Sequence, residues 1–135
     1  MPDPSGPAVL VVVWTFPAFS ETFVVDHVVG LLDRGWRVSV LCVELDPVAL
    51  AGLGDLEDRL DRLTVLGDPV ARPGAFRLAG RAVRERQWAA GRSPTARRVV
   101  RLAAALRREL SATRPDLVHA HFGPNAAAAA AALDA

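Results

Sequence analysis

The sequence predicts an α/β fold built on a parallel sheet. Residues 8–14 form a continuous, Val-rich apolar run, as expected of a strand buried on both faces of a parallel sheet, and residues 36–43 form a second Val-rich strand. Between them, apolar residues from Phe23 to Leu32 recur at helical spacing, and Gly35 is suited to the left-handed position that ends many helices. Strand, helix and strand in this order predict a right-handed βαβ unit.

Length and composition indicate one globular domain. The chain has 135 residues, of which 51% are hydrophobic, enough for a real core. We expect residues 1–7 to form a flexible N-terminal segment and the domain to begin at residue 8. Cys42 is the single cysteine, which excludes an internal disulfide and is compatible with a reducing compartment. We expect this thiol to be buried and inert. No apolar run approaches the ~18 residues that a membrane span needs.

The rest of the chain continues the alternation of helices and strands. We expect an acidic helix over residues 55–63, a short third strand over 63–66, two Arg-rich helices over 74–90 and 94–112, a fourth strand over 117–120, and an Ala-rich helix from residue 124 or 125. Alanine is the best helix former, so the last segment is assigned as helix. Because the sheet would end on an exposed helix, we expect at least one more strand after residue 135.

Polar loops follow the first and fourth predicted strands. One loop runs over residues 15–23, and the other begins at His121. Ligands of open α/β sheets bind beyond the carboxyl ends of the strands. The two loops therefore predict one shared site.

These two loops resemble a known family. Residues 16–24 read FPAFSETFV and residues 115–123 read PDLVHAHFG, which is similar to the "FPxxSETFV" and "PDxxHAHFG" segments of retaining glycosyltransferases of the GT4 type. Order and spacing also agree, over residues 8–135. The resemblance implies the N-terminal, acceptor-side half of a GT-B fold, with a Rossmann-like parallel sheet and flanking helices. Residues 8–135 would be an incomplete version of that domain, without the C-terminal donor domain.

The resemblance also implies a reaction. A sugar would pass from a nucleotide-sugar donor, held by the missing domain, to a saccharide or lipid-linked acceptor with retention of configuration, as in polysaccharide biosynthesis. The nucleotide-sugar is a co-substrate, and neither a cofactor nor a metal is expected. We expect a cytoplasmic protein, peripheral at the inner face of the plasma membrane. The alternative is a non-catalytic subunit or a truncated fragment that needs a separate donor-domain partner.

His121 is the residue that the resemblance assigns to catalysis. In that position an imidazole would reach the transferred sugar, hydrogen-bond a hydroxyl or stabilise developing charge. His119 lies two residues earlier, which predicts the same sheet face, and we interpret it as a structural residue that orients the loop. The pair has a spacing seen in metal sites, but no third ligand is evident, so no metal is predicted. His27 is interpreted as a packed boundary residue of the first helix.

Further candidates for substrate binding flank the two strand ends. The resemblance places Ser20, Glu21 and Thr22 on the cleft floor. Ser20 is expected to cap the following helix, and Glu21 is expected either to complement the helix dipole or to bind an acceptor hydroxyl. Gly123 would allow a tight turn, and Asn125 would either cap the last helix or help to bind a phosphate or hydroxyl. The loop lacks a Gly-rich pattern, so NAD is not predicted.

The basic residues are concentrated in one part of the sequence. Residues 1–67 carry four Arg and ten acidic residues, whereas residues 68–114 carry twelve Arg and three acidic residues. Helical spacing places two groups of Arg on helix faces: Arg77, Arg81 and Arg84, and then Arg97, Arg101 and Arg108. Two interpretations stay open, a solvated face and a surface for anionic lipid headgroups. No nucleic-acid recognition motif is present, so nucleic acid is not an expected partner.

Overall fold

A computed structural model describes residues 5–66, 94–121 and 123–134. In chain order the elements are β1 (Ala8–Phe16), the 3-10 helix η1 (Phe19–Glu21), α1 (Thr22–Asp33), β2 (Arg37–Leu45), α2 (Pro47–Ala51), α3 (Leu56–Arg59), β3 (Arg62–Val65), α5 (Pro94–Thr113), β4 (Leu117–Ala120) and α6 (Gly123–Leu133). The helix predicted over residues 74–90 lies outside the described residues.

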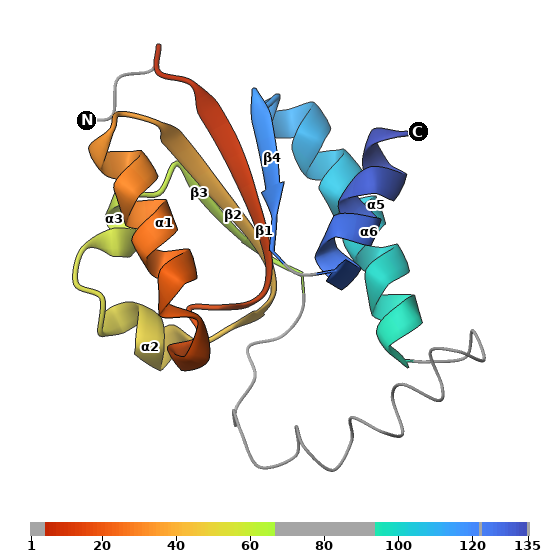
Figure 1. The fold of residues 1–135 in the computed structure, drawn as a ribbon, viewed down its shortest axis with the longest axis horizontal. Coiled ribbons are helices and arrows are strands. Elements are labelled where there is room, and N and C mark those ends of the chain that lie inside the picture. The colour runs from red at the N-terminus through yellow and green to blue at the C-terminus, as the bar shows by residue number, and fades with distance from the viewer. Residues whose placement is uncertain (1–4, 67–93, 122, 135) are drawn as a thin grey trace.

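Four parallel strands form the sheet, in the order β3-β2-β1-β4. Helices α1, α2 and α3 cover one face, and α5 and α6 cover the other (Figure 1). The chain proceeds outward from β1 through β2 to β3 and then returns to the opposite side of β1 with β4. The predicted α/β class and the parallel sheet are confirmed, and this order is that of a Rossmann-like fold.

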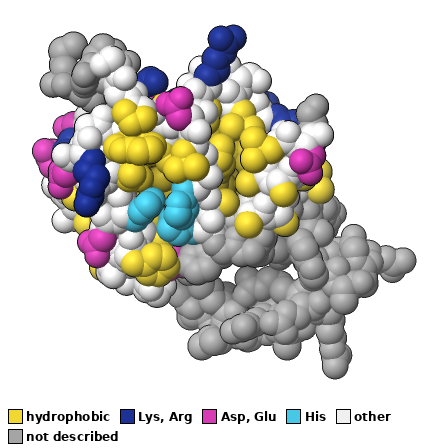
Figure 2. Space-filling model, turned by 45° about the horizontal axis from the view of Figure 1, so that its top comes forward, with side chains coloured by type: hydrophobic (Ala, Val, Ile, Leu, Met, Phe, Trp, Pro, Cys, Tyr) yellow, Lys and Arg dark blue, Asp and Glu magenta, His cyan; other side chains and the backbone are white. Residues whose placement is uncertain are grey.

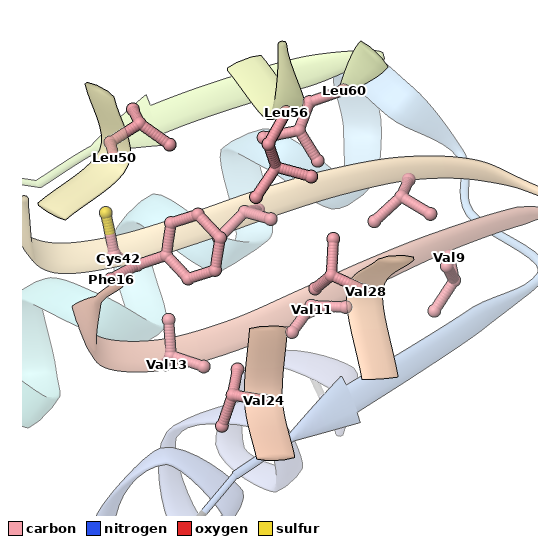
Figure 3. Packing of buried hydrophobic residues seen from close by; sticks show 12 residues of the cluster. Val9, Val11, Val13, Phe16, Val24, Val28, Cys42, Leu50, Leu56 and Leu60 are labelled. Atoms are coloured by element: carbon pink, nitrogen blue, oxygen red, sulfur yellow. The ribbon is translucent and has the colours of Figure 1, made fainter. Parts of the chain in front are cut away.

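Strand β1 is buried on both sides, as its continuous apolar run predicts. Val9, Val11 and Val13 face α1, and Figure 3 shows them directed toward Val24 and Val28 of that helix. The intervening residues of β1 contribute to the core under α5 and α6. Burial of a Val-sized side chain stabilises a fold by roughly 1.5–3 kcal/mol, so this strand is the main anchor of the sheet.

The second core lies between the sheet and the last two helices. Leu102 and Leu106 of α5 pack there with Ala128, Ala129 and Ala132 of α6. Small side chains let α6 approach closely, and the guanidinium Nη2 of Arg107 donates a hydrogen bond to the carbonyl of Ala131 at 3.1 Å. The expectation of an exposed Ala-rich helix is therefore wrong, because one face of α6 is part of the core.

Helix α1 ends where the sequence predicts. Gly35 has a positive φ of 79°. Its backbone N–H donates to the carbonyl of Leu32 at 3.0 Å, and the N–H of Trp36 donates to the carbonyl of Leu31 at 3.1 Å. These two bonds form a Schellman motif, which satisfies carbonyls that the helix itself leaves free.

Several boundaries differ from the prediction. β1 and β2 each continue two residues further, β3 begins one residue earlier, and α5 ends one residue later. The predicted acidic helix is shortened to α3, while α2 was not predicted.

The carboxylate of Asp46 caps α2 by accepting hydrogen bonds from the N–H groups of Val48 at 3.1 Å and Ala49 at 2.9 Å. Pro47 occupies the first turn, where its missing N–H costs nothing.

Candidate functional site

The strand order defines where a site is expected. β2 lies on one side of β1 and β4 on the other, so the connections diverge at the carboxyl ends of β1 and β4. Such a divergence leaves a crevice in open α/β sheets. His119 of β4 is in register with Val11 of β1, and the backbone N–H of His121 donates to the carbonyl of Val12 at 2.9 Å. The sheet itself thus fixes both histidines at the carboxyl end of β4, where such a crevice is expected.

The three histidines of the chain meet there. The ring centroids of His119 and His121 are 4.4 Å apart, those of His27 and His119 are 4.6 Å apart, and those of His27 and His121 are 5.8 Å apart. All three rings are half-buried. Figure 2 shows histidine side chains together on one face of the molecule, bordered by hydrophobic side chains. We call these three residues the histidine cluster.

The electrostatics of the cluster favour neutral imidazole. Burial lowers the pKa of His27 below its usual value, and the neighbouring His119 lowers it further. The pKa of His121 is lowered first by burial and then by His119 and His27. The buried Nε2 of His27 has no hydrogen-bond partner among the residues that the structure describes. The neutral form is therefore favoured for His27 and His121, and a neutral imidazole keeps a lone pair that can accept a hydrogen bond or bind a Lewis acid.

The prediction that His119 and His121 share a sheet face agrees with their adjacent rings. The expectation that no third ligand is at hand is wrong, because one ligand atom from each of His27, His119 and His121 lies within 4.8 Å of the other two. Helical spacing identified His27 only as a packing residue. Its meeting with β4 depends on the strand order, which places β4 beside β1 and under α1.

Two exposed phenylalanines precede His27 in the chain, and one of them contacts the cluster. Phe19 is 85% exposed and Phe23 is 52% exposed. The ring centroid of Phe23 is 6.0 Å from that of His121. Phe23 precedes His27 by one helical turn, so both project from the same side of α1. Helical spacing places Phe23 on the apolar stripe of the helix, whereas no sequence signal singles out Phe19.

The loop after β1 carries the predicted polar candidates. Ser20 is exposed in η1, Thr22 is exposed at the start of α1, and Glu21 is half-buried between them. Ser20 does not cap α1, because Glu21 occupies the N-cap position and makes no side-chain cap hydrogen bond. The 3-10 turn moves the helix start beyond Ser20. Ser20 and Glu21 therefore have no side-chain capping role.

The residues after β4 support the loop of His121. Gly123 is the first residue of α6, and Asn125 is buried in its first turn. The Nδ2 of Asn125 donates to the backbone carbonyl of His121 at 2.5 Å. The predicted cap is therefore wrong, because α6 begins two residues before Asn125. This side chain instead fixes the backbone of His121, while its own Oδ1 has no partner within the described ranges.

The predicted Arg surface is described only in part. Arg101 and Arg108 are exposed on α5. Arg77, Arg81 and Arg84 lie outside the described residues, as does the side chain of Arg97. Among the helices that the structure describes, none is long and apolar enough to cross a membrane.

Comparison with known proteins identifies the family. A family model described as a glycosyl transferase 4-like domain matches residues 20–135. This match includes the whole histidine cluster and most of the chain. Neither the curated proteins nor the solved structures contain a match. The chain belongs to the glycosyl transferase 4-like family.

Proposed function

We propose that this chain is the acceptor-side domain of a retaining glycosyltransferase, with its reaction centre at the carboxyl ends of β1 and β4. The enzyme would move a sugar from a nucleotide-sugar donor to a saccharide or lipid-linked acceptor. The observation that carries the proposal is the position of His121. In a chain of this family, a ring fixed by the sheet stands at the strand divergence.

His121 has the properties that contact with the transferred sugar requires. Its lowered pKa keeps the ring neutral near pH 7, so one ring nitrogen donates and the other accepts. Its backbone is held on one side by Val12 and on the other by Asn125. A fixed ring can hydrogen-bond a sugar hydroxyl, or stabilise charge that develops as the donor's glycosidic bond breaks, without first reorganising. His119, packed against it, orients that ring.

The loop after β1 supplies surface suited to an acceptor. Phe19 and Phe23 expose aromatic rings, which can cover the apolar face of a sugar ring or a lipid chain. Ser20, Glu21 and Thr22 stand among them and carry oxygen atoms for acceptor hydroxyls. Alternating aromatic and hydroxyl-binding groups match the alternating apolar and polar faces of a saccharide.

The donor belongs to another part of the enzyme. A C-terminal domain, or a separate donor-domain partner, would hold the nucleotide. Helix dipoles and basic side chains would stabilise the leaving diphosphate, so that transfer needs no metal or cofactor. If such a partner supplies all catalytic groups, the present domain acts as a non-catalytic binding subunit, and His121 is then dispensable for the chemical step.

Sugar transfer by the native protein, isolated from its source, tests the proposal. With a panel of nucleotide-sugars and saccharide acceptors, His121→Ala is expected to lower kcat by about 10²–10³-fold, as does loss of one group that stabilises a transition state. Asp26→Ala, an exposed change on the same helix as His27, is the control. Full transfer by the His121→Ala enzyme would contradict the catalytic role. Absence of transfer from every nucleotide-sugar would contradict the transferase itself.

A further inference from the structure

The convergence of the histidines is not required by the core. His27 comes from α1, His119 from β4, and His121 from the turn that follows β4. The adjacent positions in each element, such as Val28 of α1, already fill the apolar interior. A chain with only three histidines nevertheless brings one ring nitrogen of each within 4.8 Å of the others.

We propose that His27, His119 and His121 together bind one Zn²⁺ ion. Imidazole nitrogen is a preferred zinc ligand, at a Zn–N distance of roughly 2.0–2.1 Å. Tetrahedral geometry at that distance places ligand nitrogens about 3.4 Å apart. The candidate ligand atoms already lie within 4.8 Å of one another, so binding would require only a modest further approach of the three rings. The rings are mutually tilted by 33–75° rather than stacked in parallel, which allows their nitrogens to point to a common centre.

The surroundings of the cluster support a bound cation in two ways. A bound ion would satisfy the buried Nε2 of His27, which has no hydrogen-bond partner within the described part of the chain. The backbone also holds two ligands in place, through the register of β4 with β1 and the hydrogen bond from Asn125 to the carbonyl of His121.

Three histidines leave one position of a tetrahedral ion open. Sites of this kind hold water or a substrate oxygen in the fourth position. On the proposed function, on which this step rests, zinc would occupy the ring nitrogen that His121 offers to the sugar. Zinc and substrate would then compete, and zinc would inhibit transfer rather than promote it.

Zinc binding by the untagged, chelator-treated chain tests the site without any sugar. Isothermal titration with ZnCl₂ is expected to give one ion per chain. His27→Ala is expected to weaken binding by at least about 100-fold, because loss of an outer-shell partner alone costs 10–100-fold. Asp26→Ala is the matched control, since it removes an exposed carboxylate beside His27 and should leave affinity unchanged. Co²⁺ added to the wild type should show the intense visible absorption of tetrahedral coordination.

Two results would contradict a zinc site at the histidine cluster. Equal zinc affinity in the wild type and His27→Ala would overturn the proposal, as would Co²⁺ that keeps the weak spectrum of the hydrated ion. His27→Gln, which keeps most of the side-chain volume, guards against misfolding: it must melt like the wild type and still lose zinc. Transfer assays with a chelator present test the proposed function separately. Failure of the zinc site would leave transfer and its loss on His121→Ala unchanged, whereas failure of the transferase would leave zinc binding intact.

Discussion

The centre of the sheet and its carboxyl edge differ sharply although they share the same elements. Val11 is fully buried, and its register partner on β4 is His119, which is half-buried. On α1, Val28 is fully buried, and the residue before it is His27. These core positions are aliphatic. The register partner of Val11 on the next strand, His119, and the residue before Val28, His27, carry imidazole rings instead. Stability and the proposed chemistry are therefore assigned to different residues, and substitutions should separate them.

The largest expected difference in stability is between alanine substitutions of a buried and an exposed phenylalanine. Phe16 is fully buried in the core between the sheet and helices α1, α2 and α3, whereas Phe19 is 85% exposed. Phe16→Ala is expected to lower the free energy of unfolding by about 3–5 kcal/mol, because it leaves a cavity. Phe19→Ala should change it by no more than about 0.5 kcal/mol but weaken saccharide binding. Urea unfolding of both variants measures the difference. Equal losses would mean that the exposed ring is structural.

The pH dependence of stability tests the burial of the Cys42 thiol in the core. Burial, and secondarily Glu44, raises the pKa of its thiol to about 12 from an ordinary value of 9.0. The folded state thus keeps a proton that the unfolded state loses. Stability is fully present below pH 9 and is expected to fall by about 1.4 kcal/mol per pH unit between pH 9 and 12.

The composition makes this titration easy to isolate. The chain contains no Tyr and no Lys, so no other side chain has an ordinary pKa between 9 and 12. Urea unfolding as a function of pH should show the alkaline loss in the wild type and not in Cys42→Ala. Native protein should also resist thiol alkylation at pH 8 until it is unfolded. Rapid alkylation of the folded chain would show that the strand is accessible.

Two glycines, one inside the C-terminal part of α1 and one just after the helix, give smaller effects of opposite sign. Gly35 has a φ of 79°, and a Cβ there would meet no atom within 4 Å. Gly35→Ala should therefore cost about 1–2 kcal/mol from backbone strain alone. Gly30→Ala, inside the helix, should be neutral or stabilising by up to about 1 kcal/mol, provided that the Arg34 side chain moves. Thermal unfolding of both variants decides whether the Schellman turn fixes the helix that carries His27.

The smallest expected effect concerns the arginines of α5. If that helix contacts anionic lipid, Arg108→Ala should weaken binding to phosphatidylserine vesicles by about 1 kcal/mol, close to fivefold. Arg34→Ala removes the same charge from α1, on the opposite face of the sheet, and should have no effect. Equal weakening by both variants would indicate attraction by net charge, and no binding in cosedimentation would favour a merely solvated face.

Sequence patterns predicted the centre of this molecule better than its edge. Val-rich runs identified the buried strands β1 and β2, and Gly35 identified the end of α1, because each depends on local chemistry. The HxH spacing identified half of the histidine cluster. His27 was assigned to packing because helical periodicity says nothing of which strand lies beneath a helix. The Asp46–Pro47 pair was a cap signal for α2 that the prediction overlooked.

Contact between the histidine cluster and a sugar is the central claim, and side-chain NMR tests it most directly. With three histidines in the chain, three single substitutions assign their ring signals. Addition of a panel of mono- and disaccharides in chelating buffer is expected to shift the ring signal of His121 most, that of His119 less, and the methyl signals of Val11 and Val28 not at all. Shifts confined to residues away from β1 and β4, with unchanged histidine signals for a saccharide that binds, would contradict the assignment of the site.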